Sequence, residues 1–264
     1  MNNVIDKNFI DCKAAFLLSQ WKVQPRYTPA SPPAEKPSEN PRAGSMHRSD
    51  TIRNSDTAND SLKGFLMAAY HNEYRLSLTP ICIAAGLPAG TGSRIAEECV
   101  KRNLIKIIQV PFGRGRPKYP VLLPDGYALL GVQPKTPLGR GAGYEHTLYQ
   151  HLIAKHLKEL KPTIELNRND KFIDVGIETN EGLICIEIAM TAVHEKINIE
   201  KNITLAKAKA VIVACLNEKV LTDVREIITQ LPEEYQMKTK TILIPELLKA
   251  KPDEIITNQT KLGL

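Results

Sequence analysis

The sequence predicts two folded domains, an α+β domain over residues 60–131 and an α/β domain with a mixed sheet over residues 144–250. The first observation is a hairpin pattern at residues 172–190, where apolar and polar residues alternate as they do in half-buried strands. The second is the length of the chain, since 264 residues are enough for two hydrophobic cores. The third is composition, because proline- and glycine-rich stretches separate the two patterned regions.

The N-terminal part lacks the pattern of a folded domain. Residues 1–25 contain one apolar segment with nothing beside it to pack against, so we predict an element that docks on a partner or on the later domains. Residues 26–59 are rich in Pro, Ser, Asn and charged residues, which predicts a disordered linker. We predict no membrane span and no signal peptide. Five cysteines without CxxC spacing indicate buried thiols and a cytoplasmic protein.

The positive charge is concentrated in one region. The formal net charge of the chain is +6, and residues 61–143 hold 11 basic and 4 acidic side chains, a net charge of +7. Residues 1–60 carry +1 and residues 144–264 carry −2. Such a bias in a small domain favours a polyanionic partner, most simply nucleic acid.

Residues 60–131 show the order helix, helix, helix, hairpin. The first helix is SLKGFLMAAY, and Thr79-Pro80 provides a cap and a first-turn proline for the second, PICIAA. Gly86-Leu87-Pro88 ends that helix, and a third helix runs from Thr91 or Ser93 to Asn103. A hairpin follows with the loop PFGRGRPK, and PDGYALLG begins a further helix.

This order resembles the winged helix-turn-helix, which implies that the third helix and the hairpin loop contact duplex DNA. At the start of that helix, bases or phosphates would meet Thr91, Ser93 and Arg94. Later in it, the DNA backbone would meet Lys101 and Arg102. The loop offers Arg114, Arg116 and Lys118, and its RGRPK is similar to the AT-hook core, which implies arginines in a minor groove. A solvated basic turn and a winged helix used for protein contact remain alternatives.

Residues 132–143 form a second linker, and the α/β domain then opens with the helix YEHTLYQHLIAKHLKEL. Its histidines His146, His151 and His156 are five apart, which spreads them around the helix and predicts surface or packing roles. After the hairpin, a helix from Thr191 to about Lys207 carries a polar stripe at Glu195, Asn198 and Asn202. The buried strand AVIVACL, an amphipathic helix, the strand TKTILI and a tail at residues 251–264 complete the domain.

The hairpin places two carboxylates together. Apolar residues on one face of the two strands are Ile173, Val175, Ile177, Ile184, Ile186, Ile188 and Met190. A two-residue loop at Glu181-Gly182 pairs residue 178 with 185, 176 with 187 and 174 with 189. Asp174 and Glu187 then lie diagonally on one face, roughly 7–8 Å apart, which suits a shared divalent cation.

Two carboxylates on a hairpin followed by a helix resemble the core of the PD-(D/E)xK nuclease superfamily. The resemblance implies that Asp174 and Glu187 hold Mg²⁺ and activate a water for DNA cleavage. The lysine of the motif corresponds to Ala189, so the resemblance implies a substitute on the next helix, Lys201 first and Lys196 second. Glu145 on the opening helix corresponds to an acidic residue that reaches the metal in some members, and first-turn glutamates are also favoured by the helix dipole.

The linker, HRSD, the winged-helix pattern and EIAMT together resemble the C-terminal regions of FtsK/HerA-type ATPases of conjugative elements. The resemblance implies DNA processing on mobile DNA, with a DNA-translocating ATPase on another chain because this sequence has no GxxxxGK[ST] loop. Three hypotheses follow: a DNA-binding protein with a degenerate nuclease domain, an active Mg²⁺-dependent endonuclease, or a transcriptional regulator whose C-terminal domain dimerises or senses a ligand. Ala189 favours the first, and a homodimer stays open.

Overall fold

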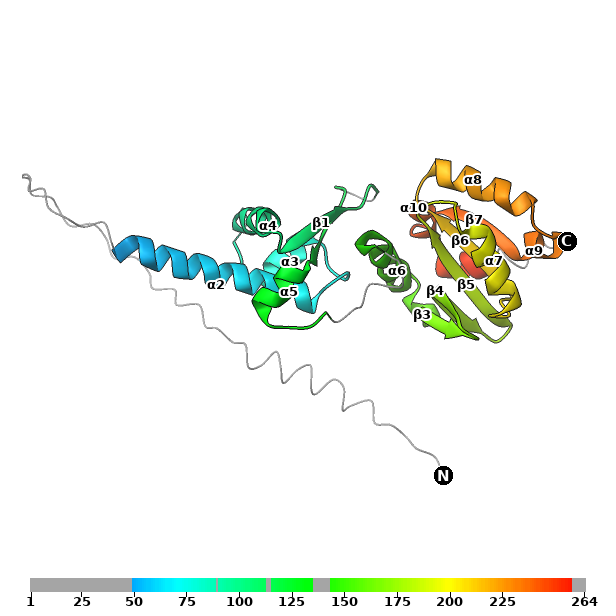
Figure 1. The fold of residues 1–264 in the computed structure, drawn as a ribbon, viewed down its shortest axis with the longest axis horizontal. Helices are drawn as coiled ribbons and strands as arrows, with labels where there is room; N and C mark the ends of the chain where they lie inside the picture. The colour runs from blue at the N-terminus through cyan, green and yellow to red at the C-terminus, as the bar shows by residue number, and fades with distance from the viewer. Residues whose placement is uncertain (1–48, 89, 113–114, 135–142, 258–264) are drawn as a thin grey trace, which may run out of the picture. The chain divides into compact units, whose positions relative to one another are not determined.

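The computed structural model describes residues 49–88, 90–112, 115–134 and 143–257 (Figure 1). The predicted docking element at residues 1–25, most of the linker at residues 26–59 and Arg114 lie outside the described residues. The described chain consists of a mainly helical part, residues 49–134, and a sheet part, residues 143–257, and each is described by itself.

The helical part follows the predicted order of three helices, a hairpin and a further helix. Its elements are α2 (Ser49–His71), α3 (Leu78–Ala84), α4 (Thr91–Lys101), β1 (Ile105–Gln109), β2 (Lys118–Leu122) and α5 (Pro124–Leu130). Helix α2 begins at Ser49, within the segment predicted as linker. Its buried residues Leu62, Phe65, Leu66 and Ala69 recur at helical spacing and form a core with Ile81, Ala96, Cys99, Leu104, Ile105, Leu122 and Tyr127.

Close packing fixes α4 against α3. A Cβ added at Gly92 would lie 2.3 Å from Sγ of Cys82, so glycine is required for this approach. Helix α3 begins at Leu78 after Ser77 as its N-cap residue, two residues before the predicted cap at Thr79. Strands β1 and β2 pair antiparallel, with Ile105 opposite Leu122, and this hairpin carries the basic loop.

The sheet part contains the predicted mixed sheet, with five strands in the order β3-β4-β5-β6-β7. Its elements are α6 (Tyr144–His156), η1 (Lys158–Leu160), β3 (Thr163–Arg168), β4 (Lys171–Thr179), β5 (Gly182–Ala189), α7 (Glu195–Thr204), β6 (Ala210–Cys215), α8 (Glu218–Thr229), α9 (Glu233–Lys238), β7 (Thr239–Leu243), α10 (Ile244–Leu247) and α11 (Pro252–Thr257). Strands β3, β4 and β5 pair antiparallel, and β6 and β7 continue the sheet in parallel with β5.

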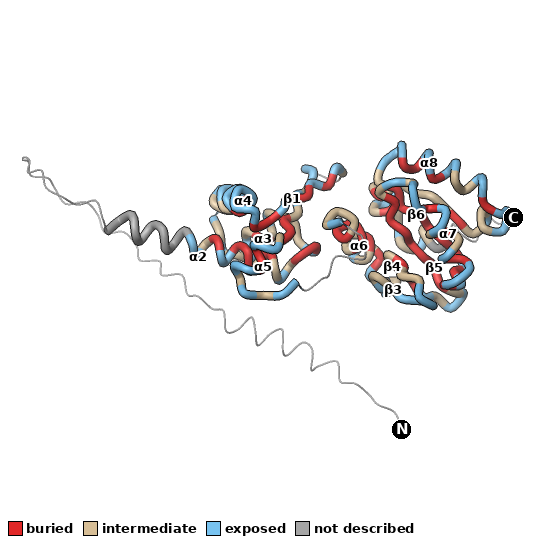
Figure 2. The backbone as a smooth tube through the Cα atoms, viewed as in Figure 1, coloured by how far each residue is buried: buried red, intermediate tan, exposed pale blue. Residues whose placement is uncertain are grey.

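Helices cover both faces of this sheet (Figure 1). On one face, α6 and α10 pack on a core that includes Leu148, Tyr149, Ile153, Ile184, Ile186, Ile188, Ile212 and Leu247. On the other, α7 and α8 pack on a core that includes Cys185, Ala189, Ile199, Ile203, Val211, Val213, Val220 and Val224. Strand β6 is buried along its whole length, as its continuous apolar sequence predicts (Figure 2). No helix among the described residues is long and apolar enough to cross a membrane.

The predicted register of the β4–β5 hairpin is wrong by two residues. Thr179 pairs with Gly182, so the two-residue loop consists of Asn180 and Glu181, one position earlier than predicted. Gly182 has a φ of 133°, which favours glycine at this end of the turn. Residue 176 therefore pairs with 185, not with 187. Because side chains alternate with a period of two, a shift of two leaves each residue on its predicted face of β5.

Strand β4 is irregular at Asp174, which has no Cα partner in either neighbouring strand. Ile173 belongs to the core under α7, whereas Val175 and Ile177 belong to the core under α6. The predicted common face for these three residues is therefore wrong. Opposite the irregularity, Glu165 of β3 has a φ of 54°, a left-handed conformation that is costly for a residue with a side chain. The break lets the Asp174 side chain bond to the neighbouring strand.

Candidate functional site

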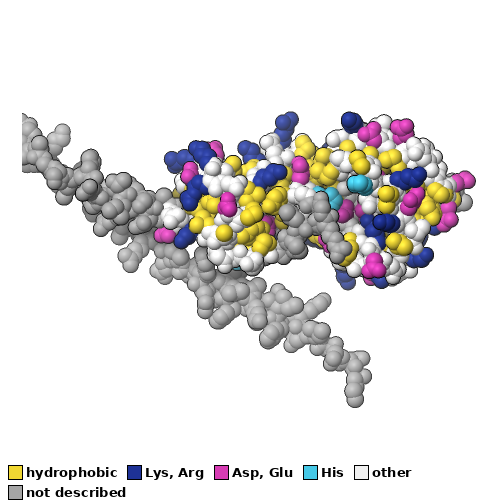
Figure 3. All heavy atoms as spheres, viewed as in Figure 1, with side chains coloured by type: hydrophobic (Ala, Val, Ile, Leu, Met, Phe, Trp, Pro, Cys, Tyr) yellow, Lys and Arg dark blue, Asp and Glu magenta, His cyan; other side chains and the backbone are white. Residues whose placement is uncertain are grey.

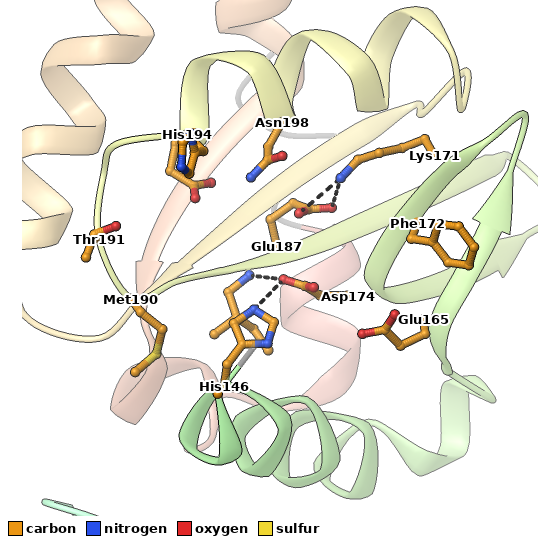
Figure 4. A pocket seen from close by; sticks show the side chains of 13 residues that line it. His146, Glu165, Lys171, Phe172, Asp174, Glu187, Met190, Thr191, His194 and Asn198 are labelled. Atoms are coloured by element: carbon orange, nitrogen blue, oxygen red, sulfur yellow. Dashed lines mark hydrogen bonds and ion pairs between the residues drawn. The ribbon is translucent and has the colours of Figure 1, made fainter. Parts of the chain in front are cut away.

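A pocket of about 420 Å³ opens beside this irregularity (Figure 4). Strands β3, β4 and β5, the first turns of α6 and α7 and the residues before each of these helices supply its lining. Polar side chains dominate it, including His146, Glu165, Lys171, Asp174, Glu187 and Glu195. The two acids predicted from the hairpin thus face one pocket, although they are held by opposite layers of the fold.

Asp174 is held from the α6 side. Its Oδ2 accepts a hydrogen bond of 2.8 Å from the backbone N–H of Ile188 and lies 3.1 Å from Nε2 of His146 (Figure 4). Its Oδ1 accepts a bond of 3.1 Å from Nε2 of Gln150, one turn further along α6. The same Gln150 nitrogen donates to Oε1 of Glu165 at 2.9 Å. The Gln150 amide therefore links the carboxylates of Asp174 and Glu165. The position of the Glu165 carboxylate depends in turn on the left-handed backbone at Glu165.

Glu187 is held from the α7 side by a lysine and an amide. Lys171 Nζ lies 3.3 Å from Oε1 and 3.4 Å from Oε2 of Glu187 (Figure 4). Asn202 of α7 donates to Oε1 at 2.8 Å and is fully buried. The side chains of Lys171 and Glu187 are 11% and 4% exposed, so solvent screens this ion pair weakly.

The pocket holds more negative charge than its cation balances. Burial, and then the charge of Asp174, raises the pKa of Glu187 to about 8, and Lys171 and Asn202 offset only part of this. Burial and Asp174 likewise raise the pKa of Glu195 to about 7. Burial by itself lowers the pKa of His146, but the hydrogen bond and charge of Asp174 raise it overall. A site that raises the pKa of its carboxylates in this way suits a positively charged ligand, which would stabilise their charged forms.

The polar stripe predicted on the helix after the hairpin faces the pocket. Glu195 and Asn198 line it, and Asn202 reaches Glu187. Figure 4 shows Asn198 directed from α7 toward Glu187. This polar face of α7 therefore belongs to the pocket and is not simply a solvated surface.

Other predicted residues lie elsewhere. Lys201, the preferred substitute lysine, is exposed on α7 and does not line the pocket, and Lys196 is exposed as well. Glu145 is half-buried on α6, and the neighbouring His146 reaches the site in its place. Ala189 is buried in the core under α7. The structure brings Lys171, not Lys201, to Glu187.

Sequence reasoning missed four polar residues of this pocket and its surroundings: Lys171, His146, Gln150 and Glu165. A signal was present for two of them, since His146 and Gln150 stand four apart on α6 and therefore share a helical face. The even spacing of the three histidines predicts a surface or packing role for His146, whereas the structure places it in the pocket beside Asp174. The signal for Lys171 was hidden by the irregularity in β4.

In the helical part, most of the predicted DNA-contacting residues that the structure describes lie on the surface. Ser93, Arg94 and Lys101 are exposed on α4, Arg102 follows them, and Thr91 is half-buried. Arg116 and Lys118 are exposed at the second strand of the hairpin. Figure 3 shows Lys and Arg side chains gathered over the region of α4. Two acidic residues, Glu97 and Glu98, are also exposed on this helix.

Among the described residues, no three His, Cys, Asp or Glu side chains form a preassembled metal-binding group. Comparison of the chain with models of protein families, with curated proteins and with solved structures gave no match.

Proposed function

We propose that the chain is a DNA-binding, metal-dependent nuclease, with a winged helix at residues 60–131 and a PD-(D/E)xK-like catalytic domain at residues 144–250. The observation that carries the proposal is Lys171, whose Nζ lies 3.3 Å from Glu187 in the pocket that Asp174 also lines. This lysine offers the cation that Ala189 removes from its usual place. For that reason we prefer the active enzyme over a degenerate nuclease domain.

The donor set supports a divalent cation. Asp174 and Glu187 offer hard carboxylate oxygens, which are the ligands that Mg²⁺ prefers. Magnesium commonly uses one or two protein carboxylates and completes its shell with waters and substrate phosphate, so a third protein acid is not required. When bound, the ion would polarise the phosphate and stabilise the charge that develops on it. The raised pKa of Glu187 supports the same conclusion, because a nearby cation would stabilise the charged carboxylate and so offset the effects of burial and of the Asp174 charge.

Cation binding should be visible without DNA. Adding Mg²⁺ or Mn²⁺ at about 100 times the dissociation constant should stabilise the fold by about 2.7 kcal/mol, seen as a higher Tm. The double variant Asp174→Asn, Glu187→Gln should lose this gain, whereas Asp223→Asn, Glu226→Gln, which changes two exposed acids of α8, should keep it. An equal gain in both variants would mean that the ion binds elsewhere.

The basic surface of the helical part supports the DNA-binding half of the proposal. Residues 61–143 carry a net charge of +7, and the exposed basic residues include Arg94 on α4 and Arg116 beside the hairpin loop. Phosphate contacts of this kind dominate non-specific affinity, and arginines beside a narrow minor groove favour A·T-rich sites. The exposed Glu97 and Glu98 add acceptors that suit cytosine N4 in the major groove.

Removing basic residues should weaken duplex binding and its salt dependence together. For Arg94→Ala, Arg116→Ala, Lys118→Ala we expect the slope of log affinity against log salt to fall by about one unit per lost phosphate contact. The matched triple Lys219→Ala, Lys249→Ala, Lys251→Ala removes the same charge from exposed positions of the sheet part. Fluorescence anisotropy with a labelled duplex measures the affinity of both triple variants, and we expect only the first to bind more weakly than the parent. Equal losses would refute binding through the winged helix.

A role on mobile DNA beside a separate DNA-translocating ATPase remains a prediction from the sequence.

A further inference from the structure

Glu195 is a fourth carboxylate of the pocket, beside Glu165, Asp174 and Glu187. Its hydrogen bonding differs from that of Asp174 and Glu187. It lies in the first turn of α7, lines the pocket and is only 5% exposed. Its Oε2 is buried and has no hydrogen-bond partner among the described residues. Buried polar atoms are nearly always satisfied, so an unpartnered carboxylate oxygen on a residue that lines a pocket indicates that a ligand in the pocket donates to it.

The groups around Glu195 leave this oxygen free because they are engaged with each other. From β4, Lys171 is paired with Glu187 of β5, and Asp174 is bonded to His146 of α6. From its own helix, Asn198 bonds to the Glu195 carboxylate. On β6, Cys215 is also near enough for Glu195 to influence its pKa, and its Sγ donates to the carbonyl of Val213. The cations that approach Glu195 are therefore held by other acids.

Three acids of the pocket, Asp174, Glu187 and Glu195, differ in the role that their contacts allow. Both oxygens of Asp174 accept hydrogen bonds, and both oxygens of Glu187 lie near Lys171. An ammonium group offers only donors, so Lys171 in its ion pair is suited to holding or neutralising negative charge and not to accepting a proton. Of these three, only Glu195 has a buried carboxylate oxygen without a hydrogen-bond partner among the described residues, and Glu195 lines the pocket that a substrate would enter.

We propose that Glu195 is the proton acceptor for the water that attacks the phosphodiester. The inference rests on the proposed function, since it needs a phosphodiester in the pocket. The water oxygen forms a bond to phosphorus while the bond from phosphorus to one ester oxygen breaks. One proton of the water passes to the carboxylate of Glu195, and the departing ester oxygen takes a proton from solvent. Water is the only co-reactant, and no atom changes oxidation state.

The electrostatics of the pocket agree with this role. Burial, and then the charge of Asp174, brings the pKa of Glu195 to about 7, while Lys171 and His146 limit the rise. A general base works best when its pKa is near the working pH, because it is then both deprotonated and basic enough. Carboxylates in water, with pKa values near 4, are much weaker bases.

The test uses the full chain, supercoiled plasmid and saturating Mg²⁺, with initial cleavage rates measured from about pH 5.5 to 9, the range in which such a base titrates. The variant is Glu195→Gln, which keeps the shape of the side chain. Its control is Glu200→Gln, on the same helix, half-buried and outside the pocket lining. Duplex affinity and the Tm gain from Mg²⁺ are measured alongside.

For the parent and for Glu200→Gln we expect a rate that rises with pH and levels off. For Glu195→Gln we expect a plateau rate lower by about 10²–10⁴-fold and loss of that pH profile, with unchanged duplex affinity and unchanged Tm gain. A parent-like rate and profile in Glu195→Gln would overturn the proton-acceptor role. So would loss of the Tm gain, because Glu195 would then be a cation ligand. A parent that cuts no DNA would overturn the proposed function itself, and this inference with it.

Discussion

Lys171→Ala should lower the rate of DNA cleavage in Mg²⁺ by about 10²–10³-fold, the usual effect of removing one preorganised electrostatic group from an active site. Lys171 lies within 3.4 Å of both oxygens of Glu187, and its side chain is 11% exposed, so its charge acts in a poorly screened environment. Removing it leaves Glu187 beside Asp174 without its nearest cation. Initial rates of plasmid nicking at saturating Mg²⁺ measure the effect.

Lys201→Ala is the matched comparison, because Lys201 was the substitute lysine expected from the sequence and is exposed on α7. We expect a rate within about twofold of the parent, as for surface substitutions away from an active site. The reverse result, a large loss for Lys201→Ala and none for Lys171→Ala, would restore the first assignment. Small effects of both substitutions on the cleavage rate would mean that neither lysine takes part in catalysis.

Without a divalent cation, the free energy of unfolding should fall as the pH rises from about 4.5 to about 8. The pKa of Glu187 is raised from 4.5 to about 8, with burial as the main cause and Asp174 as the second. Between these two pKa values the folded state holds the Glu187 proton and the unfolded state does not. Stability falls with rising pH wherever the folded state binds more protons, so this carboxylate destabilises the fold progressively across the window. Glu195, with its pKa raised to about 7, acts in the same direction.

Urea unfolding in EDTA at several pH values measures this dependence. Glu187→Gln should flatten the fall, because an amide keeps the hydrogen-bonding shape and does not ionise. Glu218→Gln, an exposed residue in the first turn of α8, should not flatten it. A parent stability that is constant or increasing over the window would show that Glu187 ionises freely in the fold.

The hairpin acids could be predicted from the sequence because strand alternation has a period of two. Placing the turn one residue late shifted the register by two, and that error preserved which residues of β5 face α7. The polar stripe of α7 was equally visible at helical spacing. Periodicity therefore identified Asp174, Glu187, Glu195 and Asn198 as members of two polar faces, although it left open whether those faces were solvated.

Lys171 could not be predicted in the same way, because regular alternation assigns residues 171, 173 and 175 to one apolar face. In the structure, β4 changes face at Asp174, so Ile173 lies in the core under α7 and Val175 in the core under α6. The segment before Asp174 thereby moves to the side of Glu187, and Lys171 moves with it. The irregularity depends on β3, where Glu165 is left-handed, and on Ile188, whose N–H bonds to Asp174. These contacts come from neighbouring strands and leave no local sequence signal.

The arrangement of His146 and Gln150 is also a tertiary result. Their spacing on α6 puts them on one helical face, but only the packing of α6 on the sheet turns that face toward Asp174. The neighbouring Glu145 is the candidate that the nuclease resemblance implies, because some members of that family carry an acidic metal ligand on this helix. The orientation of α6 determines which of the neighbouring residues Glu145 and His146 faces the pocket.

The most direct test of the account is nicking of supercoiled plasmid by the full chain in Mg²⁺ or Mn²⁺, compared with the variant Asp174→Asn, Glu187→Gln. These substitutions keep the shapes of both side chains and remove both charges. We expect nicked and then linear DNA with the parent, and no product with the variant or in EDTA. Cleavage that persists in the variant, or a parent that binds DNA and divalent cation but never cuts, would contradict the assignment of this pocket as a nuclease site.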